Sequence, residues 1–252
     1  MTEKKPLIML TNDDGIEAPG LKALVDFLKD LGEIVVVAPE SAQSGKSSAI
    51  TVDAPLRLTQ VADYDGIKMM KVNGTPVDCV KLGLHAALSR KPDLVVSGIN
   101  HGSNSGNSVI YSGTMGAAME ACIVGIPAIG FSLLHHSLDA DFTHCKPIVR
   151  EITGKILDNG LPNEICLNVN IPAGCIPKGI KVTEASRGHW TEEYAEYIDP
   201  NGKPFYWLTG QFIDDDPDCD LTDNYWLSRQ WATIVPVRPD QTAAGDFLKS
   251  MF

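Results

Sequence analysis

Short apolar runs alternate along this chain with longer segments whose apolar residues recur every three or four positions. The runs predict buried β-strands over residues 7–10, 34–38, 93–97, 126–132 and 165–169. The longer segments predict helices over residues 20–31, 76–89, 115–121 and 142–157. Strands and helices that alternate at these lengths are typical of β-α-β units with parallel strands and right-handed crossovers. The pattern therefore predicts an α/β fold with a doubly wound, mostly parallel sheet.

Two stretches depart from this alternation. Residues 52–72 resemble two weak strands around a polar turn at residues 64–66, which suggests a hairpin. Beyond Pro172, turn-forming and aromatic residues alternate with short β-like runs at residues 180–183, 205–208 and 233–237. We expect these runs to form hairpins outside the doubly wound core and, because isolated hairpins are marginally stable, to pack on a neighbouring subunit. The expected organisation is a catalytic core over residues 1–175, followed by a β-hairpin oligomerisation arm and C-terminal segment over residues 176–252, in a single functional domain.

Composition narrows the classes of partner. The chain has 252 residues, is 44% hydrophobic and carries a formal net charge of −11, so it lacks the broad positive field that binds duplex nucleic acid or an anionic membrane. The apolar run near the N-terminus stops at Asn12, which makes it too short for a signal peptide or a membrane span. Six cysteines are scattered without a C-x-x-C pair, which favours free thiols over disulfides or a zinc site. We therefore expect a cytoplasmic protein.

Two adjacent carboxylates, Asp13 and Asp14, follow the first predicted strand. The carboxyl ends of strands are where open α/β sheets bind ligands. Neighbouring ionised carboxylates repel each other unless a cation or a shared proton lies between them, so this pair suggests a hard divalent metal ion. The alternative is a solvated turn in which Asn12, Asp13 and Gly15 supply only turn and helix-capping chemistry.

Neutral oxygen donors follow two further strands. Ser44 lies in the loop 39–51, and Asn100 lies in a Gly- and Asn-rich loop after the strand 93–97. With Asp13 and Asp14 they would form an all-oxygen set that suits Mg²⁺ or Mn²⁺. The Gly45-Lys46-Ser47 run in the first loop is not a nucleotide-triphosphate loop, because Glu40 stands where that motif needs glycine. Taken singly, each of these side chains could instead be an ordinary loop residue.

Helix starts supply further candidates. The turn Ser112-Gly113-Thr114 opens a helix of small residues, where unpaired N–H groups and the helix dipole could hold a phosphate. Capping of that helix by Ser or Thr is an equally good explanation. Thr75 and Asp78 at the preceding helix are explained by capping alone. A metal ion and an anion-binding turn at one edge of a sheet indicate phosphate chemistry.

Several motifs in this order closely resemble the SurE (survival protein E) family of metal-dependent 5′/3′-nucleotidases. They are TNDDG, AP followed by QSG and AIT, NGTPxDCVKLG, DLVVSGIN with its GxNxG continuation, YSGTMGAAMEA, LNVNIP, and the C-terminal YWLTG and TD. The resemblance covers nearly the whole chain. It implies a Rossmann-like N-terminal fold, a C-terminal arm exchanged between subunits of a homodimer or homotetramer, and removal of phosphate from nucleoside monophosphates.

The resemblance also assigns roles to residues. It implies one divalent metal ion per subunit, Mg²⁺ or Mn²⁺, held by Asp13, Asp14, Ser44 and Asn100, with Asp13 and Asp14 as the catalytic pair. Asn104 and the turn Ser112-Gly113-Thr114 match the family's substrate-phosphate pocket. The chain departs from many members at Ser47-Ser48-Ala49, where they carry Gly-His-Ser, so a contribution of that histidine is not expected here.

Three rival functions stand beside hydrolysis of a phosphomonoester at a metal ion. A phosphatase with an aspartyl nucleophile would place D-x-D after the first strand, whereas Asp13 and Asp14 are adjacent. A dinucleotide-dependent oxidoreductase would carry G-x-G-x-x-G there, which this sequence lacks. A non-catalytic nucleotide-binding regulatory module would bind nucleotides without releasing phosphate. The sequence alone leaves open the base, the choice between 5′ and 3′ esters, activity on polyphosphate, and the general acid.

Overall fold

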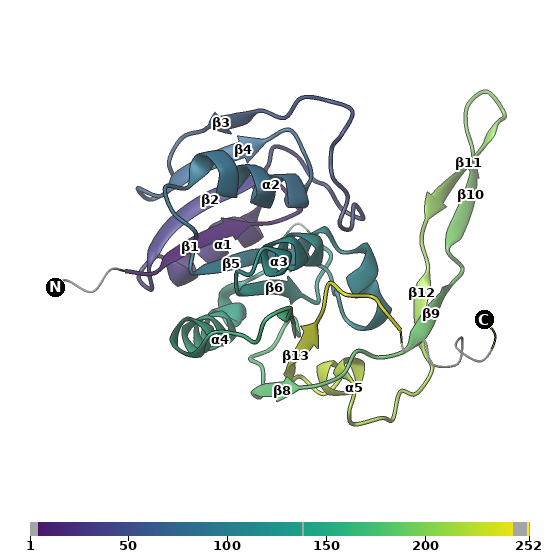
Figure 1. Cartoon of the computed structure of the whole chain (residues 1–252). Helices are drawn as coiled ribbons and strands as arrows, with labels where there is room; N and C mark the ends of the chain where they lie inside the picture. Colours follow the sequence, from purple (N-terminus) through teal and green to yellow (C-terminus); the bar gives the residue numbers. More distant parts are fainter. Residues whose placement is uncertain (1–4, 138, 244–250, 252) are drawn as a thin grey trace.

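A nine-stranded sheet forms the centre of the computed structural model, which describes residues 5–137, 139–243 and 251 (Figure 1). The strands lie in the order β3-β4-β2-β1-β5-β6-β7-β13-β8. Their bounds are β1 Leu7–Thr11, β2 Glu33–Pro39, β3 Leu58–Gln60, β4 Lys68–Val72, β5 Leu94–His101, β6 Ala128–Leu133, β7 Cys166–Ile171, β8 Ile180–Val182 and β13 Ala232–Val237. The pairs from β4 to β7 are all parallel, and β3 joins β4 antiparallel. The doubly wound sheet and the hairpin within residues 52–72 are therefore confirmed.

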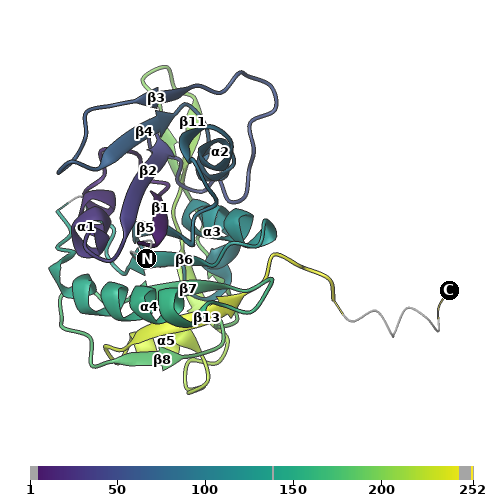
Figure 2. The ribbon, with the colours of Figure 1, turned by 60° about the vertical axis from the view of Figure 1, so that its left-hand side comes forward.

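Helices cover both faces of the sheet (Figure 2). Their bounds are α1 Pro19–Leu28, α2 Pro76–Leu82, α3 Gly113–Ile123, α4 Lys146–Asn159 and α5 Asp223–Leu227. Successive strand residues point to opposite faces, and so Ile8 and Leu10 join the core beneath α1 and α4, whereas Leu7 and Met9 join the core beneath α2 and α3. Two buried layers thus hold the strand ends in fixed positions.

β5 is longer than the sequence predicts. The apolar pattern places its end near Ser97, but the strand continues to His101 after a shift in its register with β6. The shift passes through Gly98, whose φ is +126° and whose missing Cβ would lie 2.3 Å from the Phe131 carbonyl oxygen. Only glycine fits this conformation and this contact. Asn100 is consequently carried by a strand of the sheet and not by a loop.

The C-terminal segment is divided between the sheet and an arm. β13 pairs antiparallel with β7 and parallel with β8, so two runs that we expected outside the core belong to it. Burial explains the place of β13, because Ala232, Thr233 and Val235 are all buried in the sheet, and β8 pairs with its outer edge. Two antiparallel pairs do lie outside, as expected, and form an extended arm from β9 Gly188–Thr191, β10 Tyr194–Ile198, β11 Pro204–Leu208 and β12 Gln211–Asp214 (Figure 1).

Asp78 joins the start of α2 to the loop 39–51. The predicted capping box is present, with the Thr75 hydroxyl accepting from the Asp78 N–H and the Asp78 carboxylate accepting from the Thr75 N–H. The same carboxylate also accepts from the Thr51 N–H at 3.1 Å and from the Thr51 hydroxyl at 2.6 Å. Asp78 therefore anchors the loop that carries Ser44, in addition to capping the helix.

We expect the Asp78→Asn variant to lose about 1–2 kcal/mol of unfolding free energy at pH 7. Burial raises the pKa of Asp78, but the hydrogen bonds from Thr51 and Thr75 outweigh it and hold the pKa below its usual 3.8. An acid with a lowered folded pKa stabilises the fold above its unfolded pKa and loses that contribution as the pH falls. Denaturant unfolding should therefore show a difference at pH 7 that shrinks by pH 3. The matched control is Asp53→Asn, two residues after that loop, where the side chain is exposed.

Candidate functional site

A cavity of about 570 Å³ opens at the carboxyl ends of the central strands. Five of the residues that the sequence singled out line it, namely Asp13, Ser44, Asn100, Asn104 and Ser112. They come from four separate segments of the chain. Parallel strands place their carboxyl ends at one edge of a sheet, and this topology brings the segments together.

Asp13 is almost fully buried in the cavity wall and is held by α3. One carboxylate oxygen accepts a hydrogen bond of 2.5 Å from the Thr114 hydroxyl, and the backbone carbonyl accepts from the Gln43 N–H at 2.7 Å. Burial raises the pKa of Asp13 to about 6; the Thr114 hydrogen bond opposes this shift and the charge of Asp14 adds to it. A cation bound beside Asp13 would offset the cost of the buried charge.

Gly113 and Thr114 are buried against Asp13. A Cβ atom on Gly113 would lie 2.9 Å from the Asp13 Cβ and 3.1 Å from its Oδ2. This spacing leaves no room for a larger residue without movement of the carboxylate. The two residues therefore fix Asp13, and their place at the first turn of α3 also directs its N–H groups toward this end of the sheet.

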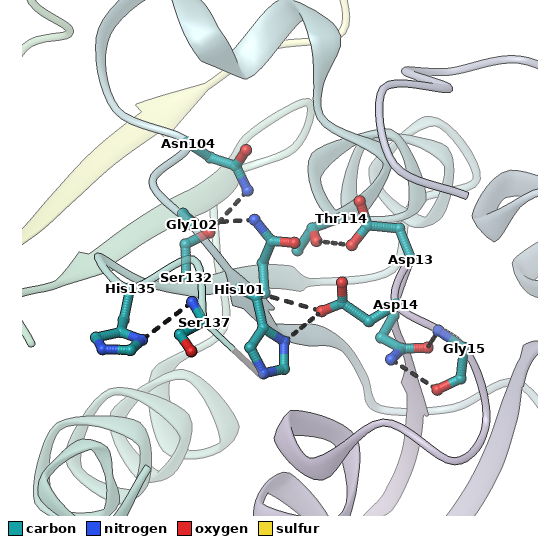
Figure 3. A network of polar contacts seen from close by, with 12 residues as sticks. Asp13, Asp14, Gly15, His101, Gly102, Asn104, Thr114, Ser132, His135 and Ser137 are labelled. Atoms are coloured by element: carbon teal, nitrogen blue, oxygen red, sulfur yellow. Dashed lines mark hydrogen bonds and ion pairs between the residues drawn. The ribbon is translucent and has the colours of Figure 1, made fainter. Parts of the chain in front are cut away.

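Asp14 is the less buried carboxylate and is held by His101. Its Oδ2 accepts from the His101 backbone N–H at 3.2 Å and lies 3.1 Å from His101 Nδ1. The His101 ring packs edge-on against Phe142, with ring centroids 5.1 Å apart. In Figure 3 the carboxylates of Asp13 and Asp14 point toward the same space. His101 was not among the residues that the sequence singled out, because its place next to Asn100 matters only once β5 extends that far.

The side chains near the two carboxylates could offer neutral oxygen atoms as metal ligands. The Asn100 side-chain amide donates from Nδ2 to the Gly102 carbonyl at 2.9 Å, which directs its own carbonyl oxygen away from Gly102. Ser44 is exposed on the cavity wall. Within residues 5–137, 139–243 and 251, no group of three or more His, Cys, Asp or Glu side chains could hold a metal. Two carboxylates with neutral oxygens fit Mg²⁺ or Mn²⁺ better than zinc, which prefers nitrogen and sulfur.

Aromatic side chains also line the cavity, and the arm supplies some of them. Tyr111 precedes α3, and Trp190 and Tyr194 come from β9 and β10. Trp190 is braced edge-on by Phe212, with ring centroids 5.8 Å apart. We expected the arm to serve assembly alone, and so these wall residues were missed. Their signal in the sequence is the concentration of aromatic residues after position 189, but that pattern does not say where they point.

Ser112 both caps α3 and lines the cavity. Its hydroxyl accepts from the Met115 N–H at 3.0 Å, so the capping explanation holds for this side chain. Asn104 also lines the cavity, and its side-chain amide donates to the Ser132 hydroxyl at 2.7 Å. Both residues therefore offer hydrogen-bonding groups to the cavity that Asp13 also lines.

Comparisons with known proteins agree with this architecture. The family model described as "Survival protein SurE" matches residues 8–192. A protein named 5′-nucleotidase SurE from Christiangramia forsetii is 51% identical over 247 residues, covering 96% of this chain and 95% of the relative. One of the same name from Bacteroides fragilis is 46% identical over 243 residues, covering 96% and 95%. The crystal structure of a SurE protein from Aquifex aeolicus matches with a TM-score of 0.82 and 38% identity, covering 98% of each chain.

Among the described residues, no helix has the length and apolar character needed to cross a membrane.

Proposed function

The chain belongs to the SurE family, and on that premise we propose that it is a metal-dependent 5′/3′-nucleotidase that hydrolyses nucleoside monophosphates to nucleoside and inorganic phosphate. The observation that carries the proposal is the shared cavity of Asp13, Ser44 and Asn100, with Asp14 beside it. Its volume of about 570 Å³ is within the range that accommodates small-molecule ligands.

Asp13, Asp14, Ser44 and Asn100 would hold one divalent ion, Mg²⁺ or Mn²⁺. When bound, such an ion supplies Lewis acidity toward a phosphate oxygen and lowers the pKa of water. Asp14 orients the attacking water through the carboxylate oxygen that His101 does not engage. Asp13 contributes the second negative charge at the site, and Thr114 and Gly113 keep it in place.

The chain's own donors bind the phosphate. Asn104, Ser112 and the N–H groups of the turn through Gly113 and Thr114 bind phosphoryl oxygens and stabilise the charge that they carry in the transition state. The aromatic side chains of Tyr111 and Trp190 line the same cavity and offer flat apolar faces, which suit a nucleobase. Together these features support a nucleoside monophosphate as the substrate.

The test is release of inorganic phosphate from a panel of nucleoside 5′- and 3′-monophosphates in Mn²⁺, in Mg²⁺ and in excess chelator. We expect release in at least one metal and none in chelator, because the carboxylate pair needs a cation to act on a dianionic ester. Saturable nucleotide binding without release in any metal would contradict the proposal and favour the regulatory module. Trapping of a phosphorylated Asp13 would favour the aspartyl-nucleophile phosphatase instead.

We also propose that the arm joins two or four copies of this chain. The hairpin β10–β11 exposes a dense apolar set, consisting of Tyr194, Tyr197, Ile198, Phe205, Tyr206, Trp207 and Leu208. An extended two-stranded hairpin cannot bury these side chains itself, and contiguous exposed apolar surface marks interaction sites. Sedimentation equilibrium of the full chain distinguishes monomer, dimer and tetramer.

The six free cysteines, four of them buried, further suit a reducing compartment such as the cytoplasm.

A further inference from the structure

Three polar side chains are buried in the middle of the sheet beneath the cavity. Ser132 on β6 and Asn170 on β7 are register partners, and Asn168 lies two residues before Asn170 on the same face. Their exposed fractions are 0%, 0% and 1%, respectively. Buried polar side chains destabilise a fold unless their hydrogen bonds are satisfied, so their placement calls for an explanation. The LNVNIP motif contributes both asparagines, and neither phosphate binding nor metal binding accounts for it.

All three side chains converge on one residue of the cavity wall, Asn104. Asn170 Oδ1 accepts from the Asn104 N–H at 2.8 Å, and Asn168 Nδ2 donates to the Asn104 carbonyl at 2.8 Å. Ser132 accepts from Asn104 Nδ2 at 2.7 Å, as Figure 3 shows. Asn170 Nδ2 also donates to Asn168 Oδ1 at 3.1 Å, which fixes both side-chain amides relative to each other.

Asn104 is therefore held at its N–H, its carbonyl and its side chain. It lies between the end of β5 and the 3₁₀ turn Gly106–Tyr111, where its backbone groups bond to side chains and not to a neighbouring strand. The second hydrogen of its Nδ2 remains for a ligand on the cavity side. A pocket for a tetrahedral anion needs donors fixed to within a fraction of an ångström, and such precision comes from groups behind the pocket.

We propose that Asn168 and Asn170 are positioning residues for the phosphate pocket and act through Asn104. This inference rests on the proposed phosphohydrolase function. The pair of asparagines holds the Asn104 backbone at the one depth above β6 and β7 that lets its side chain reach both Ser132 and a phosphate oxygen. The alternating pattern of β7 then serves both the core and the site, because its apolar residues face α4 and its asparagine side chains face the pocket.

The first test compares Asn170→Leu with Thr233→Val in the full chain. Leucine matches asparagine in shape but cannot accept from the Asn104 N–H. We expect affinity for inorganic phosphate, measured by calorimetry, to fall about 10- to 100-fold and KM for a nucleoside monophosphate to rise in parallel. Thr233 lies directly opposite Asn170 in β13, is fully buried, and has a hydroxyl without a hydrogen-bond partner among the described residues. Its variant should keep the wild-type phosphate affinity.

A double-mutant cycle separates positioning from a general loss of structure. If Asn170 acts through Asn104, the double variant Asn104→Ala with Asn170→Leu should bind phosphate no more weakly than the weaker single variant. If the fold-losses in phosphate affinity of the two single variants multiply in the double variant, the inference is overturned. Asn170→Ser, which is polar but too short to reach the Asn104 N–H, goes through the same cycle should the leucine variant fail to fold.

The two proposals fail in different ways. A wild-type chain that releases phosphate from nucleotides, with an Asn170→Leu variant of unchanged phosphate affinity, would overturn the positioning role and leave the proposed function standing. A wild-type chain that neither binds inorganic phosphate nor releases it from nucleotides in any metal would overturn both. If the wild-type chain binds phosphate but does not hydrolyse nucleotides, comparing the phosphate affinities of wild type and Asn170→Leu by calorimetry still tests the positioning role.

Discussion

Replacing Asp13 with Asn should lower kcat/KM for nucleoside monophosphates about a thousandfold or more in Mn²⁺, because the site loses one of its two negative charges and with it several kcal/mol of stabilisation through the cation. The shape of the side chain is kept, and its carbonyl oxygen can still accept from the Thr114 hydroxyl. Steady-state kinetics and direct Mn²⁺ titration are the measurements. Wild-type Mn²⁺ affinity in this variant would contradict the assignment of Asp13 as a ligand.

The same variant should be harder to unfold than wild type when metal is removed. Asp13 is 4% exposed, and burial, opposed by the Thr114 hydrogen bond and reinforced by Asp14, raises its pKa to about 6. An acid whose folded pKa lies above its unfolded pKa lowers the stability of the fold as the pH rises above the unfolded value of 3.8, and the whole cost is present above about pH 6. In chelator at pH 7 we expect Asp13→Asn to gain on the order of 1–3 kcal/mol, and this gain should vanish toward pH 4.

With added Mn²⁺, wild type should become more stable than Asp13→Asn, because only wild type gains stability from binding the ion. Thermal unfolding with and without Mn²⁺ provides the comparison, and Asp53→Asn, which removes an exposed carboxylate just after the loop 39–51, is the charge-matched control. An Asp13→Asn protein that unfolds more easily than wild type in chelator at pH 7 would show that the buried carboxylate is stabilised by contacts other than those described.

A single methyl group at Gly113 should lower kcat/KM about 10- to 100-fold, which is the cost of displacing a reacting group by a fraction of an ångström to an ångström. The added Cβ would approach the Asp13 Cβ to 2.9 Å and the Pro76 ring to 3.2 Å, so Asp13 must move. Gly113 begins α3, where alanine is an acceptable residue, and so the loss should come from the contact and not from the helix.

Gly154→Ala is the matched control for Gly113→Ala. Gly154 lies inside α4, and a Cβ there would meet no atom within 4 Å. Alanine should therefore stabilise the helix by about 0.5–1 kcal/mol and leave the kinetics unchanged. Unfolding free energies and kcat/KM for both variants test the contrast. Gly113→Ala with wild-type kcat/KM would mean that the turn tolerates the methyl group and that Asp13 does not depend on close packing by α3.

Much of the fold and part of the site follow from local sequence. The apolar runs at Leu7 and Ile34 predict buried strands, and helical spacing between them predicts the crossover, because each element's periodicity reflects its own buried face. Parallel strands then place Asp13, Ser44 and Asn100 at one edge, and the structure brings all three to one cavity. Capping by Thr75 and Asp78 was equally predictable, since a capping box involves residues only three apart.

The sequence by itself thus determined the strands, the helices and the edge of the sheet at which the chemistry lies, whereas contacts between distant segments were decided by the tertiary structure. Thr114 bonds to Asp13 across 101 residues, and His101 to Asp14 across 87. The extension of β5 depends on a register shift against β6, and β13 joined the sheet because β7 offered it a free edge. Periodicity records which face of an element is buried, but it does not record which element covers that face. Packing alone selects the partner, and so Trp190 of the arm and Asn170 of β7 acquired their places at the site only in the folded chain.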